Sequence, residues 1–400
     1  MSNTVMSFRY KIELIYLDIK NNYIKKITNE CLKSMIIDHN YDSNNCMPVI
    51  YLNLSLDKSF VDNIILNKNT NLFTLVLYKY DELADTILET ECFRKKCVYF
   101  LPDDVSNTDS IDYNETNIEQ NIENTFKQIN LGLICLDHIN NNKRSLEIAA
   151  GNASVYDCAK YCTSHIPNMI IEPFSYNEHY NQIIMPTKDS VNKALKFLNN
   201  FRVFYSTPYR YYQDFNYTYI ISSSGKAIRR KDEKYSSIII NIQDILAVDA
   251  NDPGISINKE RQSYEVVVNY INASVSDNTL VNKSKNKLKG ITSSGVDLKT
   301  LKNNASYSTE KIESIRLNND NTNMLDNIEY DYNSSNAFVS IIKSNLDTDI
   351  FSINKRYTIN HIERYQKLNG EYLLSRKREI YIREDETFIM DSILNFRKID

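Results

Sequence analysis

Glycine is scarce in this sequence, which holds 7 glycines in 400 residues and no tryptophan. A loop that binds phosphate needs glycine because its backbone must approach the anion closely, often with positive φ. The glycines do not form the G-x-G-x-x-G pattern of dinucleotide-binding proteins. Gly290 and Gly295 have P-loop spacing, but Val296 and Asp297 stand where lysine and a hydroxyl residue are required. The sequence therefore argues against the common nucleotide-binding loops.

Signals for catalysis and metal binding are also few. Cys158, Cys162 and His165 have the spacing C-x3-C-x2-H, with His179 downstream. Both cysteines fall on the apolar stripe of a predicted helix, where a free cysteine packs as a small hydrophobic residue. A catalytic Cys–His or Ser–His pair is an alternative that the sequence leaves open, because the two side chains need to be close in the fold but not in the sequence. We predict no catalytic, metal-binding or cofactor-binding residue and expect no enzymatic activity.

The targeting signals are absent as well. The first ten residues lack a basic stretch followed by an apolar one, so we expect no signal peptide, and no run of 18 apolar residues predicts a membrane span. The 7 cysteines, an odd number in a chain without a signal peptide, indicate reduced thiols. The formal net charge of −4 argues against a dedicated nucleic-acid-binding protein.

Alternating apolar residues dominate the first part of the chain. Phe8, Tyr10, Ile12 and Leu14 alternate with polar residues, which is typical of a half-buried strand. Similar runs predict further strands at 50–56, 73–77, 97–101 and 129–136. Together they predict an N-terminal barrel-like β domain over residues 1–140. Within it, residues 102–125 are acidic and carry no lysine or arginine, so we expect an exposed loop.

The middle of the chain, residues 141–230, has a mixed pattern. Ser154 can cap a helix with Asp157 at the capping-box position, and Val155, Cys158, Ala159 and Cys162 follow on one face. A second helix is predicted near 187–198, and strand-like runs follow it. This region therefore predicts a mixed α/β domain.

The last part, residues 231–400, again favours strands. Runs at 236–242 and 264–271 predict strands, and Asn369-Gly370 predicts a two-residue type I′ hairpin turn. The triplet 384–386 reads as a charged turn, and residues 281–335 form a polar insertion. The whole chain is thus predicted to be an α+β, β-rich multidomain protein. Two barrel-like β domains would lie on either side of the mixed α/β domain.

The tyrosine-rich stretch from Tyr209 to Tyr219 is the most unusual local feature. Tyrosine and arginine are enriched at protein interfaces, so we predict that Tyr209, Arg210, Tyr211 and Tyr212 lie at an interface. Two alternatives stay open: a buried aromatic layer beside a sheet, and stacking on nucleic-acid bases.

Three segments resemble the baseplate (tail) hub proteins of contractile-tailed bacteriophages. Residues 145–161, SLEIAAGNASVYDCAKY, are similar to the start of the second hub domain. Residues 184–199, IMPTKDSVNKALKFLN, resemble the segment in which a proline precedes a helix. Residues 204–225, FYSTPYRYYQDFNYTYIISSSG, resemble the segment that leads into a strand. The resemblance extends over 145–225, and elsewhere it concerns only the order of domains.

The resemblance implies a structural virion protein of the phage tail baseplate, made in the host cytoplasm. It implies a homotrimer that acts as a symmetry adaptor: two similar β domains per chain match the hexameric tail tube protein, while the trimer matches the spike protein. Baseplate wedge proteins would be further partners, and DNA would pass the central channel only as cargo. Two alternatives are another baseplate or tail-tip adaptor protein and a tail-associated cell-wall hydrolase.

Overall fold

The computed structural model describes sixteen stretches of the chain. They are residues 8–41, 46–67, 71–83, 86–102, 126–205, 207, 209–223, 228, 230, 233–243, 255–258, 262–269, 273–277, 337–344, 346–361 and 366–399. The predicted polar insertion at 281–335 lies outside the described residues. The predicted acidic loop also lies outside them, apart from residue 102.

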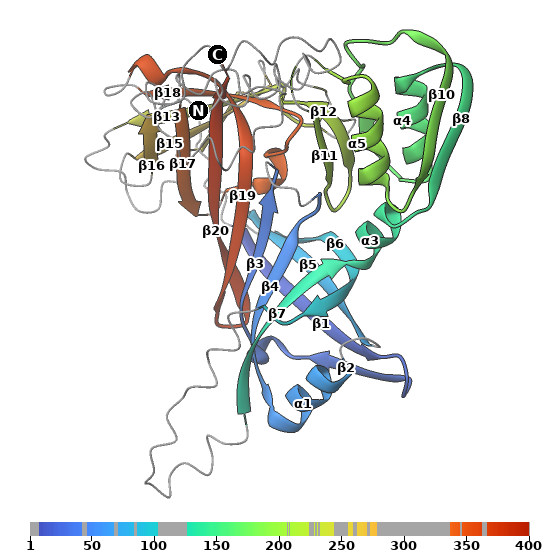
Figure 1. The fold of residues 1–400 in the computed structure, drawn as a ribbon. Coiled ribbons are helices and arrows are strands. Elements are labelled where there is room, and N and C mark those ends of the chain that lie inside the picture. The colour runs from blue at the N-terminus through green and yellow to red at the C-terminus, as the bar shows by residue number, and fades with distance from the viewer. Residues whose placement is uncertain are drawn as a thin grey trace, which may run out of the picture.

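Eight strands close into an antiparallel barrel, in the order β19-β3-β4-β7-β6-β5-β1-β20, with β20 pairing back onto β19 (Figure 1). These strands are β1 (Phe8–Asp18), β3 (Leu32–Asn40), β4 (Val49–Asp57), β5 (Asn71–Leu83), β6 (Thr86–Phe100), β7 (Phe126–Cys135), β19 (Gly370–Glu384) and β20 (Thr387–Ile399). The predicted strands of the first part are confirmed. The barrel, however, also needs the last two strands of the chain.

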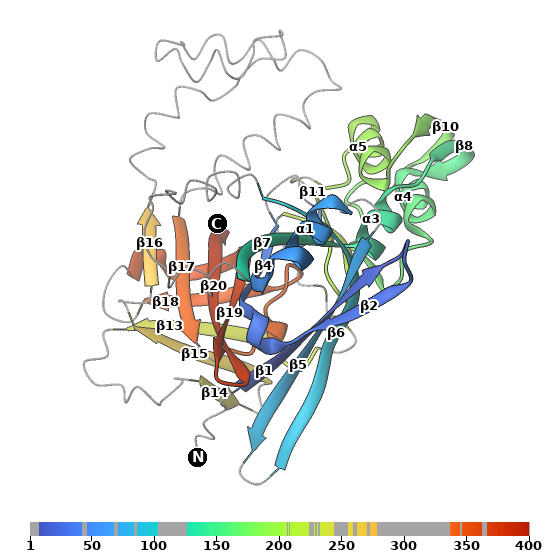
Figure 2. The ribbon, with the colours of Figure 1, turned by 90° about the horizontal axis from the view of Figure 1, so that it is seen from below.

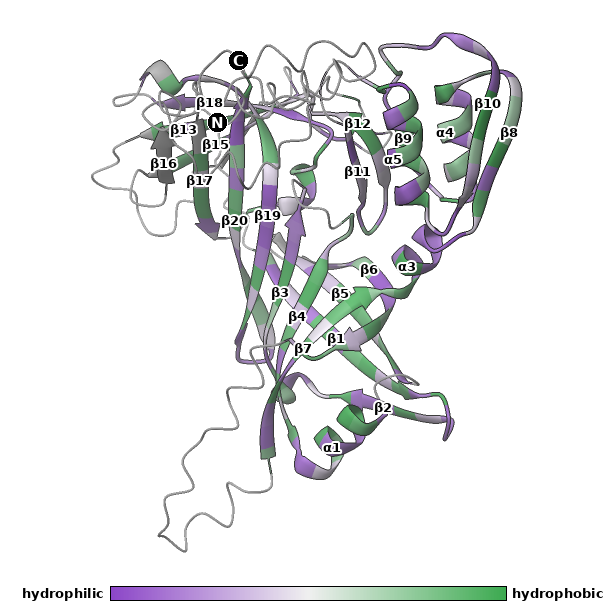
Figure 3. Cartoon of the chain, viewed as in Figure 1, coloured by the Kyte–Doolittle hydropathy of each residue, from purple (hydrophilic) through white to green (hydrophobic). Residues whose placement is uncertain are grey.

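The alternating sequence pattern explains the barrel interior. Every second residue of β1 is buried, from Phe8 to Tyr16. Figure 3 shows hydrophobic and hydrophilic residues alternating along the barrel strands. At one end, helix α1 (Lys58–Leu66) follows β4 and packs Phe60 edge-on against Tyr16. Asp57 begins this helix by accepting a hydrogen bond from the backbone N–H of Ser59. Strand β2 (Tyr23–Ile27) pairs with β1 beside it, and the 3-10 helix η1 (Asn29–Cys31) precedes β3.

A second group of strands continues the same sheet beyond the barrel. Outward from β19 the strands follow in the order β18 (Arg356–His361), β13 (Ser237–Gln243), β15 (Ser263–Asn269) and β14 (Ile255–Asn258). Outward from β20 the order is β17 (Ala337–Ser344) and then β16 (Ala273–Asp277). They enclose a separate core that includes Ile240, Tyr357, Ile359 and Phe396. The described strands do not close into a second barrel, so the predicted pair of barrels is not confirmed.

Strand β19 passes from one group of strands to the other at a bulge. Its residues from Glu371 to Leu373 pair with β18, whereas those from Arg376 to Ile382 pair with β3 of the barrel. The ladder to β20 changes register between Leu374 and Arg376. A bulge bends and twists a strand locally. The same two strands, β19 and β20, are therefore part of both units.

The mixed unit lies on a different side of the barrel from the second strand group (Figures 1 and 2). It consists of α3 (Leu136–Asn142), β8 (Leu146–Ser154), α4 (Val155–Thr163), β9 (Met169–Ile171), β10 (His179–Lys188), α5 (Val191–Phe201), β11 (Tyr209–Gln213) and β12 (Thr218–Ser222). Strands β8 and β10 form one small sheet, and β11, β12 and β9 form another.

The two predicted helices of this unit are confirmed. Ser154 caps α4, and its partnership with Asp157 forms the predicted capping box. Cys158 and Cys162 lie on the buried face of α4, as predicted. The predicted domain boundaries at residues 140 and 230 stay a prediction.

The predicted type I′ turn at Asn369-Gly370 is wrong. The connection between β18 and β19 instead contains the 3-10 helix η7 (Gln366–Leu368), although the two strands do pair antiparallel. The tight turn lies between β19 and β20, where Glu384 pairs with Thr387 and Asp385 has a φ of 54°. The predicted charged turn at 384–386 is confirmed.

Gly132 on β7 allows a close approach that any larger residue would prevent. A Cβ at this position would lie 2.3 Å from the ring of Phe100 on β6. The two residues face each other in the β6–β7 ladder. We expect Gly132→Ala to lower the free energy of unfolding by about 1–3 kcal/mol, because the ring must leave its place. Urea denaturation measures this loss, and it should shrink when Phe100→Leu is added; an unchanged loss would contradict the steric explanation.

Candidate functional site: a polar cavity at one end of the barrel

The predicted interface residues lie on β11, and most of their surface is buried within the chain. Tyr212 is 1% exposed and Arg210 is 6% exposed. The Arg210 guanidinium donates to the carbonyl of Leu374 on β19, 3.2 Å away, and Gln213 Nε2 donates to the Tyr211 hydroxyl at 3.0 Å. These contacts favour the alternative of a buried aromatic layer, while the prediction that Tyr209, Arg210, Tyr211 and Tyr212 meet a partner chain stays a prediction.

This layer borders a cavity of about 380 Å³ at one end of the barrel. Residues of β1, β3, β5, β6 and β19 form its walls. The loop from Asp214 to Tyr217 and the 3-10 helix η6 (Thr348–Ile350) lie across its end. The cavity differs from the rest of the barrel interior because so many charged side chains line it: Lys79, Glu91, Asp214, Arg230, Lys234, Asp347, Asp349, Lys355, Lys377 and Glu379.

A buried ion pair on β19 dominates the cavity wall. Lys377 Nζ lies 3.2 Å from Glu379 Oε1, and both side chains are 7% exposed. The two residues share the inward face of the strand because they are two positions apart. Burial alone would lower the pKa of Lys377, but Glu379 and Asp214 outweigh burial and raise it. Burial likewise opposes the charged form of Glu379, yet Lys377 holds its pKa below the usual value.

A second pair joins the barrel to η6. Lys79 Nζ on β5 lies 3.0 Å from Asp347 Oδ1, and Lys377 Nζ donates to the carbonyl of Thr348 at 3.4 Å. Asp349 also lines the cavity, and burial together with the neighbouring charge of Asp347 raises its pKa. The two lysines therefore hold the segment that closes the barrel end.

His39 lies at the centre of the contact with the tyrosine layer. Its Nδ1 lies 3.2 Å from the Tyr212 hydroxyl and 3.6 Å from Asp214 Oδ1, and the side chain is 1% exposed. Burial, with a smaller contribution from Lys377, lowers its pKa from 6.5 to about 4. At neutral pH the imidazole is therefore uncharged. Its Nε2 has no hydrogen-bond partner in the described part of the chain.

The chemistry of the cavity favours a structural role, in which its side chains hold neighbouring segments together, over a catalytic one. Cys92 lines it, but burial raises the pKa of that thiol to about 12, so the nucleophilic thiolate is not formed at neutral pH. Lys377 pairs with Glu379, and Lys79 pairs with Asp347. These contacts, together with those of His39, link the barrel to η6 and to the tyrosine layer. Sequence reasoning missed Lys377 and Glu379, because a run of charged residues is usually solvent-exposed.

The remaining sequence candidates lie elsewhere. His165 Nε2 is 2.9 Å from the carbonyl of Asn141, and His179 Nδ1 is 3.1 Å from the carbonyl of Asn152. No group of three or more His, Cys, Asp or Glu side chains suited to a metal ion occurs among the described residues. Within the same residues, no helix is both long and apolar enough to cross a membrane.

Comparison with known proteins gives matches among solved structures only. No family model matches the sequence, and no curated protein matches it. The fold is similar to a tail protein from Neisseria meningitidis MC58, with a TM-score of 0.41 and 10% identity over 97% of this chain and 96% of that one. It is similar to the 43 kDa tail protein of prophage MuSo2 from Shewanella oneidensis, with a TM-score of 0.39 and 10% identity over 99% and 97%.

A third similar structure is a chain from the Francisella PdpA-VgrG complex, with a TM-score of 0.40 and 11% identity. The match covers 99% of this chain and 53% of that one, so this chain spans about half of its length. Two of these three solved chains are tail proteins.

Proposed function

We propose that this chain is a structural protein of a contractile phage tail, the central hub of the baseplate. The observation that supports this most is the use of β19 and β20 in both the closed barrel and the neighbouring strand group. One chain thereby carries two β units, each with its own core, in a fixed relation to each other. The resemblance of residues 145–225 to hub proteins points to the same function.

Two β units per chain suit a symmetry adaptor. Three copies around an axis would present six β units, which is the number of subunits in a hexameric tail tube. The same trimer would present three equal surfaces to a trimeric spike. The partners proposed are therefore the tail tube protein, the spike protein and baseplate wedge proteins, with DNA only as cargo in the channel. The location proposed is the virion, after synthesis in the host cytoplasm.

We propose no enzymatic activity for the chain. The paired charges around Lys377 and the protonated thiol of Cys92 make the cavity better suited to joining segments than to attacking a substrate. A neighbouring adaptor protein of the baseplate is the second candidate, because it would share the need for a rigid β scaffold.

The oligomeric state tests this proposal. We expect light scattering after size exclusion to give three times the chain mass of 46.7 kDa for the chain alone, or, after addition of the spike protein, a complex that contains three copies of the chain. Electron microscopy of the trimer should show six similar β units on one face. A chain that remains monomeric with its spike partner and releases fragments from purified cell walls would overturn the hub assignment in favour of a hydrolase.

A further inference from the structure

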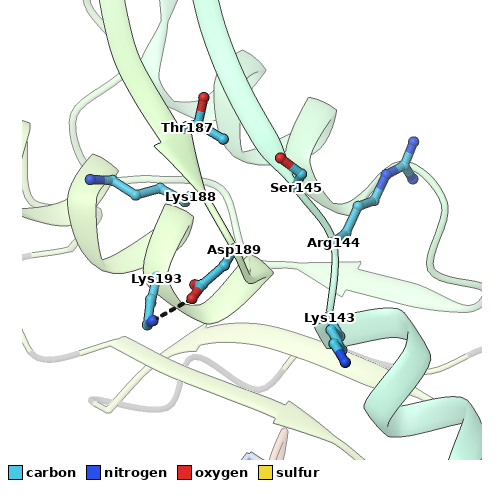
Figure 4. A pocket seen from close by; sticks show the side chains of 7 residues that line it. All are labelled: Lys143, Arg144, Ser145, Thr187, Lys188, Asp189 and Lys193. Carbon is cyan, nitrogen blue, oxygen red and sulfur yellow. Dashed lines mark hydrogen bonds and ion pairs between the residues drawn. The ribbon is translucent and has the colours of Figure 1, made fainter.

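A trough on the surface of the mixed unit brings four cationic side chains together. Residues from the end of α3, the start of β8, the end of β10 and the start of α5 line a space of about 610 Å³ (Figure 4). We call this feature the basic trough; it is lined by Lys143, Arg144, Ser145, Thr187, Lys188, Asp189 and Lys193. The chain as a whole has a formal net charge of −4, so this concentration of cations is local.

The backbone that forms the basic trough is well fixed. Leu146 pairs with Lys188 in the β8–β10 ladder, directly after a change of register that follows Met185. The backbone N–H of Asn192 donates to Asn142 Oδ1 at 3.1 Å, which ties the start of α5 to α3. Bulges and tied helix ends position side chains reproducibly, and they occur often beside binding sites.

The positive charge of the basic trough is only partly neutralised. Asp189 is engaged by Lys193 at 2.7 Å, and Glu147 beside the trough accepts a hydrogen bond from the Thr187 hydroxyl at 3.2 Å. In the described part of the chain, no carboxylate pairs with Lys143 or Arg144, and both residues are exposed. Lys193 is paired with Asp189, and Lys188 Nζ lies over the Phe197 ring, 4.8 Å from its centre. Lys143 and Arg144 are therefore the two cations available to a ligand.

We propose that the basic trough binds the phosphates of an extended polyanion, a chain of phosphate groups. The planar guanidinium of Arg144 matches two phosphate oxygens at once, and the Ser145 hydroxyl can donate to a third. Figure 4 shows Lys143, Arg144 and Lys188 pointing in different directions from the trough. One small anion would meet one or two of these groups, whereas a chain of phosphates meets them in succession.

The lining residues also indicate how such a ligand is recognised. Among the described residues no aromatic side chain lines the basic trough, so this part of the chain offers bases no stacking surface there. Contacts to phosphates alone carry no sequence information. Binding is therefore independent of base sequence and depends strongly on salt. The start of α5, an 11-residue helix capped by Ser190, adds a positive helix end next to Asp189 and Lys193.

Fluorescence anisotropy with a labelled 20-residue oligothymidylate tests the proposal. We expect K143A/R144A to weaken binding by about tenfold or more and to reduce the slope of log K against log salt by about 1.4, which corresponds to two lost phosphate contacts. The matched control is K160A/K196A, which removes two exposed cations from α4 and α5 of the same unit. Thermal unfolding followed by circular dichroism establishes that both variants are folded.

Competition distinguishes the chemistry of the ligand. Inorganic polyphosphate should displace the oligonucleotide, which would show that phosphate rather than sugar or base is recognised. Polyglutamate of similar charge should displace it at least tenfold less well. The proposal is overturned by absence of binding to the oligonucleotide, by an equal loss in K160A/K196A, or by polyglutamate competing as well as polyphosphate. None of these outcomes depends on whether the chain is a trimer.

Discussion

Replacing Lys377 by methionine should lower the free energy of unfolding by about 3–5 kcal/mol, which is the usual cost of leaving one member of a buried ion pair alone. Glu379 would remain inside the cavity wall without its partner 3.2 Å away. The contact from Lys377 to the carbonyl of Thr348 would also be lost, which loosens η6. Urea denaturation at neutral pH measures the loss.

A second substitution separates the ion pair from packing. The double variant K377M/E379L should recover part of the loss, because it removes the unpaired charge of Glu379, whereas Asp214 still lacks the nearby cation of Lys377. The matched control is Lys193→Met, which breaks a largely exposed pair with Asp189 and should cost less than about 1 kcal/mol. If Lys377→Met costs no more than Lys193→Met, the pair is solvated and the account of the cavity is wrong.

The protein should lose about 3 kcal/mol of stability between pH 6.5 and pH 4 through His39 alone. Its pKa is about 4 in the fold, against 6.5 in the unfolded chain. Within this window the unfolded chain takes up a proton that the folded chain does not, so acid favours unfolding. The size follows from about 1.4 kcal/mol per unit of pKa difference. Well above pH 6.5 the imidazole is neutral in both the folded and the unfolded chain and costs no stability, and the penalty grows as the pH falls towards 4.

His39→Gln should flatten this part of the stability curve, whereas His179→Gln, at an exposed position on β10, should leave it unchanged. Glu379 and Asp214 have pKa values lowered from 4.5 and 3.8, so the loss of their contributions begins only near the acid end of this window and continues below it. Asp349 has a raised pKa and acts in the opposite direction, since its protonation favours the fold. If the curve of His39→Gln is as steep as that of the wild type between pH 6.5 and pH 4, His39 is not the cause of the loss.

Local patterns predicted local structure well. The alternation around Tyr10 gave β1, and Ser154 with Asp157 gave the start of α4. The closure of the barrel was missed, because the pairing of Tyr10 with Phe388 depends on two distant segments that carry no shared signal. The wrong turn at Asn369-Gly370 has a similar cause, since tertiary contacts placed η7 in that connection.

The site was harder to predict than the fold. Lys377 and Glu379 lie in a stretch of charged residues that looks exposed by composition, and only closure of the barrel turns them inward. The sequence predicts Tyr212 at an interface, and β11 packs its ring against Tyr41 of the same chain. Contact of this stretch with a partner chain stays a prediction. Sequence alone does not say which partner buries an aromatic residue.

The position of β19 and β20 has a consequence for the order of folding. Both strands leave the ribosome after all other described strands, yet β3 and β1 lack one neighbour each until these last strands arrive. During synthesis the barrel is an open sheet with unpaired edges, which is a hazard for aggregation. Contacts between such distant segments also slow folding. The two β units are therefore expected to reach their final form together, in one late step.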